Sequence, residues 1–331
     1  MSAVMNTGFL PPELLRIIFA VVCGIVIVFG NAVVMGYLER KLAGRFQRRP
    51  GPMEVGWHGI LQLAVDGVKL VGKQLIIPKQ TDRVLYRLAP IISFAPAIMP
   101  MVVIPFAPKL QGRDFDIGLI FILAVVAINV LAILIAGWSS NNKYSLLGAM
   151  RSVAQNVAYE IPMLLTLLSV ILVTGTFSLR GIVEAQSGGA WFIFFMPVAF
   201  LIFFAATLAE TNRAPFDLPE AESELTAGFM TEFSGMGFSL FFMAEYTYMF
   251  IACSLTVILF LGGWSGPPLP YGEYTSALWF FAKVYALLLT MIWIRWTFPR
   301  VRFDQLLNFC WKYLVPFSLV HLLVTAVVLK L

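Results

Sequence analysis

Long runs of apolar residues, separated by polar segments, dominate this chain of 331 residues. About eight of the runs are long enough to cross the ~30 Å hydrocarbon core of a bilayer as an α-helix. Their approximate bounds are residues 14–36, 89–108, 117–138, 157–176, 190–209, 235–262, 276–296 and 312–330. We therefore predict an all-α integral membrane protein, with residues 1–331 forming a single polytopic membrane domain.

The second apolar run differs from the others in its prolines, which are Pro90, Pro96, Pro100, Pro105 and Pro108. A proline inside a helix lacks a backbone N–H, and its ring clashes with the preceding turn. Membranes tolerate such breaks where neighbouring helices satisfy the freed carbonyl groups. We therefore expect this span to be bent or broken.

A second kind of helix is predicted in the long inner loop at residues 37–88. Apolar residues recur there at three- and four-residue steps between Met53 and Gln74, whereas Asp66, Lys69 and Lys73 lie on the other face. This pattern is typical of an amphipathic helix lying at the membrane interface. We expect Asp66 to pair with a lysine on its own helix.

A basic segment, Tyr37–Pro52, links the first apolar run to this helix. Lysines and arginines just inside a membrane span attract anionic lipid, at about 1 kcal/mol each. Lipid attraction gives no reason for Glu39 to stand before Arg40 at the end of the span. The acid favours an ordered junction in which the charges are paired.

The most acidic part of the chain is the inner loop at residues 209–234. Asp217 can cap a helix there, and Glu220 suits the first turn of that helix. Glu224 lies four residues after Glu220 on the same face, where like charges repel. Arg213 can neutralise only part of this charge. We therefore expect some carboxyl pKa values in the loop to be raised and coupled.

Composition and charge agree with a membrane location, since 60% of the residues are hydrophobic and the mean hydropathy is +0.85. The net charge of +5 requires no nucleic-acid partner, because lysine and arginine collect on the cytoplasmic side of membranes. We predict that both termini lie on the outer, periplasmic side. Of the 23 lysines and arginines, that side holds only Arg16, Lys109, Arg113, Arg180, Lys283 and Lys330.

Cysteine and histidine are scarce, and the complete set is Cys23, Cys253, Cys310, His58 and His321. An iron–sulfur cluster is usually held by four thiolates, and a bis-histidine haem needs two facing imidazoles. We predict no metal site in this chain. Any electrons must be carried by another subunit or by a diffusible cofactor.

Two long segments, GILQLAVDGVKLVGKQ at Gly59–Gln74 and PFDLPEAESELTAG at Pro215–Gly228, resemble the signature segments of a known family. The family is the H-type membrane subunit of NADH:quinone oxidoreductase, which is called NADH dehydrogenase subunit 1 in mitochondrial respiratory complex I. Further runs, LERKLAGRFQRRPGP, LLGAMRSVAQNVAYE, AETNRAPFD, FFMAEY and IRWTFPRVRFDQL, resemble it in the expected order and extend the match over Leu38–Leu306.

The resemblance implies a subunit of an enzyme, a proton-translocating NADH:quinone oxidoreductase, without a catalytic residue or redox centre of its own. In the family this subunit anchors the hydrophilic arm to the membrane arm, and its inner loops help to form the chamber that receives the quinone headgroup. Simple placement of positive charge at the inner face remains an alternative for the arginines after the seventh run. The residues implied to line or brace the chamber are Arg40, Arg49, Asp66, Arg295 and Arg300.

Members of the family also carry acids leading from the quinone chamber toward the antiporter-like subunits. The corresponding residues here are Glu160, Glu210, Asp217, Glu220, Glu222, Glu224 and Glu245. Glu160 and Glu245 lie within apolar runs, where an ionisable residue is a functional candidate, and a buried structural pair is the alternative. The third run departs from a continuous chain of acids, because Asn129 is its only polar residue in mid-span. Water or Asn129 would have to provide the link.

By the same resemblance, quinone is the substrate, and FMN and iron–sulfur clusters belong to partner subunits. The implied partners are the hydrophilic subunits at the quinone site, the antiporter-like subunits and membrane lipid, in a bacterial inner membrane rather than a mitochondrial one. Two alternatives remain, the related membrane subunit of a hydrogenase or formate hydrogenlyase complex and a stand-alone ion-coupled transporter. Transporters usually show paired, interrupted spans, and only the second run here is interrupted in an obvious way.

Overall fold

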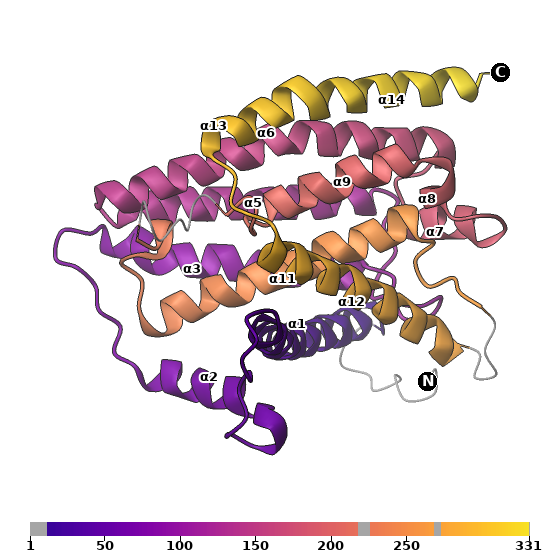
Figure 1. Cartoon of the computed structure of the whole chain (residues 1–331). Helices are drawn as coiled ribbons and strands as arrows, with labels where there is room; N and C mark the ends of the chain where they lie inside the picture. The colour runs from indigo at the N-terminus through magenta and orange to yellow at the C-terminus, as the bar shows by residue number, and fades with distance from the viewer. Residues whose placement is uncertain (1–11, 218–225, 268–272, 331) are drawn as a thin grey trace.

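The computed structural model describes residues 12–217, 226–267 and 273–330, and the elements within them are helices (Figure 1). Seven of the described helical segments are long and apolar enough to cross a membrane. They are formed by α1 (Pro12–Phe46), α3 with α4 (Arg83–Ile98, Pro100–Val103), α5 (Gly118–Ser139), α6 (Lys143–Thr174), α11 (Gly235–Phe260), α12 (Glu273–Thr297) and the unit α13, η3 and α14 (Phe303–Phe309, Cys310–Leu314, Val315–Val328). The predicted all-α multi-pass membrane fold is confirmed.

The proline-rich second span is broken, as predicted. α3 ends at Ile98, α4 resumes at Pro100, and helical structure stops at Val103, ahead of Pro105. Pro100 stands at the first position of α4, where a missing N–H removes no helical hydrogen bond.

The predicted span at residues 190–209 is shorter and interrupted. It is formed by the single turn α8 (Phe192–Phe195) and by α9 (Pro197–Glu210). Met196 between them departs from helical geometry, with φ −130° and ψ 54°. The 14 residues of α9 give about 21 Å of helix, so α8 is needed as well to approach the thickness of the hydrocarbon core.

Two helices extend beyond the predicted apolar runs at their basic ends. α1 continues to Phe46, and α6 begins at Lys143. Arg40 and Arg151 therefore lie on helices rather than in loops.

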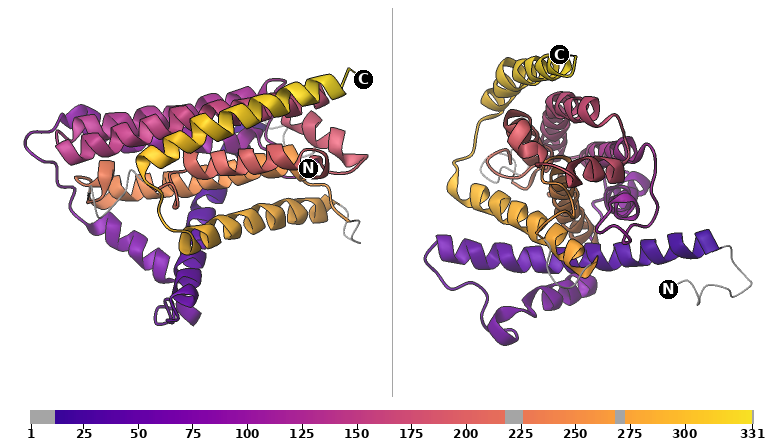
Figure 2. Two further views of the ribbon diagram at one scale, coloured as in Figure 1. Left: turned by 45° about the horizontal axis from the view of Figure 1, so that its top comes forward. Right: turned by 90° about the vertical axis from the view of Figure 1, so that its right-hand side faces the viewer.

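The amphipathic helix predicted for Met53–Gln74 is shorter in the structure. α2 covers Gln62–Gly72, and a 3-10 turn, η1 (Trp57–Gly59), precedes it. Gly56 and Gly59 interrupt the expected helix with φ values of 74° and 79°, in the left-handed region that favours glycine. α2 lies at the edge of the bundle, where it contacts α1 and α11 (Figure 2), and its valine side chains are exposed.

α11 is the central helix of the molecule. It packs against α1, α3, α9 and α12 (Figures 1 and 2). Within its 18-residue apolar stretch, 83% of the residues are buried. In contrast, α14 packs mainly along α6. Only 11% of the residues in the 18-residue apolar stretch of Phe303–Val328 are buried. Polar side chains on α11 are therefore shielded from lipid by neighbouring helices.

α7 (Leu179–Ser187) and α13 lie outside the helices predicted from the sequence. Ser178 caps α7 by accepting a hydrogen bond from a backbone N–H of its first turn. Gln186 Nε2 donates to the carbonyl groups of Ile258 and Leu259, at 2.9 and 3.3 Å. α7 thereby holds the C-terminal end of α11.

Candidate functional site

A buried cluster of charged side chains joins α1, α11, α12 and the loop after α9. Glu39 on α1 is only 8% exposed. It accepts a hydrogen bond from the Tyr246 hydroxyl at 2.5 Å and forms an ion pair with Arg295. Arg213 Nη1 lies 4.0 Å from Glu39 Oε1, so two arginines and a phenol offset the cost of burying this carboxylate. We name Glu39, Arg213, Glu245, Tyr246 and Arg295 the junction cluster.

Arg213 connects Glu39 to a second carboxylate. Its Nη2 donates to Glu245 Oε2 at 3.2 Å, and its guanidinium carbon lies 4.9 Å from the centre of the Tyr246 ring. The arginine is only 4% exposed, and a buried cation of this kind needs such partners. Arg213 was expected to neutralise part of the acidic loop, and the structure adds carboxylates from α1 and α11 to its partners.

Arg40 and Asp66 pair across the junction between α1 and α2. Arg40 Nη1 donates to Asp66 Oδ2 at 2.5 Å, and Gln62 Nε2 donates to Asp66 Oδ1 at 3.1 Å. The expected ion pair of Asp66 with Lys69 or Lys73 is wrong, because the carboxylate turns toward α1 instead. Partial burial raises the pKa of Asp66, but the hydrogen bonds from Arg40 and Gln62 outweigh it and hold that pKa below its usual range.

The segment after α12 is attached to the start of the acidic loop. Arg300 Nη2 donates to Asp217 Oδ2 at 3.3 Å, and the Val301 N–H donates to the Pro215 carbonyl at 3.1 Å. The predicted role of Asp217 as a helix cap concerns residues outside those that the structure describes. Arg49 is exposed, and its guanidinium donates to a glutamine side chain two residues away.

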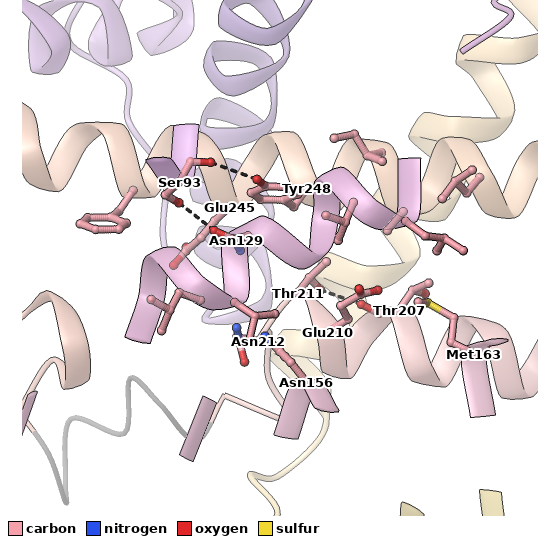
Figure 3. Close-up of a pocket in the computed structure, with 18 of the residues that line it drawn as sticks. Ser93, Asn129, Asn156, Met163, Thr207, Glu210, Thr211, Asn212, Glu245 and Tyr248 are labelled. Carbon is pink, nitrogen blue, oxygen red and sulfur yellow. Dashed lines mark hydrogen bonds between the residues drawn. The ribbon is translucent and has the colours of Figure 1, made fainter. Parts of the chain in front are cut away.

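A cavity with a mostly apolar wall and several polar side chains lies beside Glu245, within the helix bundle (Figure 3). Its volume is about 40 Å³, and a buried water needs ~10–15 Å³ on this measure, so the space can hold a few water molecules. The polar side chains that line this space, named the polar cavity below, are Ser93, Asn129, Asn156, Thr207, Glu210, Thr211, Asn212, Glu245 and Tyr248.

Asn129 takes part in a hydrogen-bonded wall of this cavity. Its Oδ1 accepts from the Ser93 hydroxyl at 2.8 Å, and the Tyr248 hydroxyl donates to the Ser93 carbonyl at 3.0 Å (Figure 3). The buried Oδ1 of Asn156 has no hydrogen-bond partner within the described ranges, and a cavity water would satisfy it. The third span, which lacks a mid-span acid, therefore borders a space that water can fill.

Among the described residues, the predicted acids lie in two groups, and Glu160 is close enough to Glu210 for their charges to interact. Glu210 and Glu245 line the polar cavity, whereas Asp217 pairs with Arg300. Glu160 is exposed on the surface of α6. In the part of the chain that the structure describes, no group of three or more His, Cys, Asp or Glu side chains could hold a metal ion. The acids that lie outside the described residues are Glu220, Glu222 and Glu224.

Glu39, Arg213 and Tyr246 belong to the junction cluster but were not among the predicted site residues. The position of Glu39 directly before Arg40 indicated a paired junction, but it did not identify the partners. Tyr246 lies 207 residues further along the chain, and a local pattern does not reveal a contact over that separation.

Comparison with known proteins covers nearly the whole chain. The NADH dehydrogenase family model matches residues 18–326. The NADH-quinone oxidoreductase H subunit of Desulfotalea psychrophila is 50% identical over 328 residues, which cover 96% of this chain and 98% of the relative. Its counterpart from Anoxybacillus flavithermus is 47% identical over 95% of each chain, and a counterpart from Geobacter metallireducens is 45% identical over 89% of this chain and 90% of the relative. With matches of this extent and identity, the chain belongs to the NADH dehydrogenase family.

Proposed function

We propose that this chain is the membrane-arm subunit of a proton-translocating NADH:quinone oxidoreductase, where it forms part of the quinone chamber and links quinone reduction to a path of carboxylates. The observation that carries the proposal is the position of Glu245, which pairs with Arg213 and also lines the polar cavity. One carboxylate thus belongs both to a basic region suited to a quinone and to a space suited to proton transfer.

The basic side chains supply the chemistry that a quinone headgroup requires. A quinone has two carbonyl acceptors and gains negative charge on reduction, and fixed guanidinium groups stabilise both. Arg295 and Arg300 are held by buried acids, so their positions are defined before a ligand arrives. We assign them to the wall of the chamber, together with Arg49 and the Arg40–Asp66 pair.

The proton path begins at the junction cluster and continues through the polar cavity. A proton can pass between Glu245 and Glu210 through cavity water, with Asn129 as a hydrogen-bonding wall. Glu160 is exposed on a membrane-crossing helix, where contact with lipid would be costly for a carboxylate. We assign Glu160 to a contact with a neighbouring antiporter-like subunit, to which the path would continue.

The redox groups belong to partner subunits in this proposal. Three cysteines are fewer than the four thiolates that usually hold an iron–sulfur cluster, so clusters and FMN are assigned to the hydrophilic arm. The names of the relatives favour a quinone-reducing complex over the hydrogenase type. The location that fits is a bacterial inner membrane, with both termini on the periplasmic side.

Replacing Arg295 with alanine in the assembled complex tests the chamber assignment. We expect the KM for quinone to rise by at least about tenfold, because a charge-assisted contact of ~1.5–3 kcal/mol is lost, while NADH oxidation by a water-soluble acceptor stays normal. Arg87→Ala is the matched control, since Arg87 is exposed. An unchanged KM and unchanged inhibitor sensitivity in Arg295→Ala would remove Arg295 from the chamber.

A further inference from the structure

A second polar space lies near the polar cavity but opens to the surface. It has a volume of about 600 Å³ and lies where the turn between α5 and α6 meets the loop before α3. Lys79, Ser140, Lys143 and Glu232 line it, and we name it the Glu232 groove. Asn142 Nδ2 donates to Glu232 Oε1 at 2.7 Å, so the carboxylate is held at the groove wall.

Buried apolar side chains line the polar cavity next to the segment that carries the groove residue Glu232. Phe229, Met230 and Phe241, which are 2%, 5% and 1% exposed, form an apolar layer together with Ile133. All of them also line the polar cavity. The Phe229 and Phe241 rings meet edge to face, with centroids 5.5 Å apart. These four apolar side chains give water little to hydrogen-bond with.

The layer is thin. Ile133 on α5 lines the cavity and Ser140, the residue directly after α5, lines the groove, and they lie about two helical turns apart, or ~10 Å. On the opposite wall, Met230 lines the cavity and Glu232 lines the groove, with only one residue between them. Three or four water molecules in file, at about 2.8 Å per hydrogen bond, would bridge this distance.

The layer depends on a short turn that packs directly on α6. Phe229 and Met230 belong to the 3-10 turn η2 (Gly228–Met230), and the Ser145 hydroxyl donates to the Phe229 carbonyl at 3.2 Å. A Cβ added at Gly148 would lie 2.8 Å from Gly228 Cα and 3.0 Å from Phe229 N. Because backbone atoms cannot yield as a flexible side chain does, the close approach requires glycine at position 148. The packing of η2 against α6 thus holds Phe229 and Met230 in position.

We propose that Phe229, Met230 and Phe241 form a hydrophobic gate between the Glu232 groove and the polar cavity, closed in this structure. Opening of η2 would let water from the groove reach Glu245 and Glu210. The gate gives the chain a second water inlet, separate from the junction cluster. The use of this inlet for proton uptake rests on the proposed function, but the existence of the gate does not.

The test measures whether water-sized ions reach the cavity from the groove. Thr207, which lines the cavity and is 1% exposed, is replaced with cysteine in the assembled complex, in sealed membrane vesicles of either orientation. Silver ion is added outside the vesicles, and its binding is measured as protection of the introduced thiol from later alkylation after unfolding, located by mass spectrometry. The chain without Thr207→Cys gives the background from Cys23, Cys253 and Cys310.

Combining Thr207→Cys with Phe241→Ala should increase the silver reaction rate at least about tenfold, because reaction of a buried thiol follows the local opening equilibrium. The increase should occur only from the face that carries the Glu232 groove. Gly148→Ala should act in the same direction, since it displaces η2 without substituting any of the three gate side chains. Gly30→Ala is the matched control on a membrane helix, because an added Cβ there meets no atom within 4 Å.

Unchanged silver rates in both gate variants would overturn the proposal, and so would equal increases from both faces. If Phe241→Ala prevents assembly, the milder Phe241→Leu and Gly148→Ala decide the outcome in its place. The assay requires no quinone turnover. If silver does not reach the cavity in the gate variants while the complex still translocates protons normally, the gate is refuted and the proton path is not. If silver reaches the cavity in the gate variants but Glu245 and Glu210 variants translocate protons normally, the proton path is refuted and the gate is not.

Discussion

Glu39 has partners from three other parts of the chain: Tyr246 on α11, Arg295 on α12 and Arg213 after α9. These contacts offset the free-energy cost of burying the Glu39 carboxylate and hold α1 against α11 and α12. Removing the acid leaves two arginines together in a buried site, so the cost is larger than the loss of one contact.

Replacing Glu39 with alanine is therefore expected to destabilise the folded subunit by about 3–5 kcal/mol, the range for breaking a buried ion pair. The measurement is the thermal unfolding midpoint of the purified complex. Glu184→Ala is the control, because Glu184 forms an exposed pair with Arg180 within α7, and such pairs contribute less than about 1 kcal/mol. Equal shifts in the two variants would contradict a special role for the Glu39 contacts.

Asp66 provides a pH test at the same scale. Its pKa is lower in the folded chain than in the unfolded one, because the hydrogen bonds from Arg40 and Gln62 outweigh the effect of burial. The stabilisation by the Arg40–Asp66 contact is thus complete above the ordinary carboxyl pKa and is lost as the pH falls through the lowered value.

We expect acidification below the ordinary carboxyl range to release α2 from α1, and the rate of proteolysis in residues 53–75 to rise. Asp66→Asn removes the titrating group, so its proteolysis rate should be high already at neutral pH and should respond less to acid. A normal acid response in Asp66→Asn would show that other groups control this junction.

At the scale of elements, the sequence is sufficient to predict the long helices and the break in the second span, because both depend on local apolar length and on prolines. The same reasoning missed α7 and the interruption at Met196, where short segments are fixed by tertiary contacts rather than by their own pattern. It placed the start of α2 too early, because Gly56 and Gly59 adopt left-handed conformations that apolar periodicity does not report.

For the candidate site, the sequence pointed to the charged residues but not to most of their pairings. Glu245 and Glu210 were two of the seven acids that the resemblance assigned to a proton path, and the structure places both at one cavity. The ion pair of Asp66 was assigned to its own helix, whereas the structure places the partner on α1. A contact between helices depends on how the helices pack, and helical periodicity identifies only which face is polar.

The C-terminal end of α11 supplies a prediction at the element scale. Lys283 Nζ donates to the carbonyl groups of Leu261, Gly263 and Ser265, at 2.7, 3.1 and 2.5 Å. These carbonyls follow the last turn of α11, where a cation also favours the helix dipole. Lys283 thus anchors the loop after the central helix to α12.

Lys283→Met should lower the stability of the complex by at least about 2 kcal/mol, because hydrogen bonds to a charged group contribute ~1.5–3 kcal/mol and the carbonyl groups lose their donor. The thermal unfolding midpoint is the readout. Lys330→Met, at an exposed position near the end of α14, should leave it unchanged. If Lys283→Met has no effect, the anchoring role is wrong.

At the scale of the whole molecule, the junction cluster and the polar cavity form one connected polar region inside an apolar helix bundle. Arg213 contacts both Glu39 and Glu245, and Glu245 faces the cavity that Glu210 also lines. Under the proposed function, this connection would let a change of charge near the quinone chamber alter the protonation of an acid within the membrane. Such coupling is what a subunit between quinone reduction and proton translocation requires.

Proton translocation by a Glu245→Gln complex in sealed vesicles tests this account most directly. Glutamine keeps the shape of the side chain but cannot carry a proton, so proton uptake driven by NADH and quinone should fall at least about tenfold, in line with loss of a proton-transferring group. NADH oxidation by a water-soluble acceptor should be unchanged, and an exposed control, Glu184→Gln, should pump normally. Normal proton translocation per quinone reduced in Glu245→Gln would contradict the central claim.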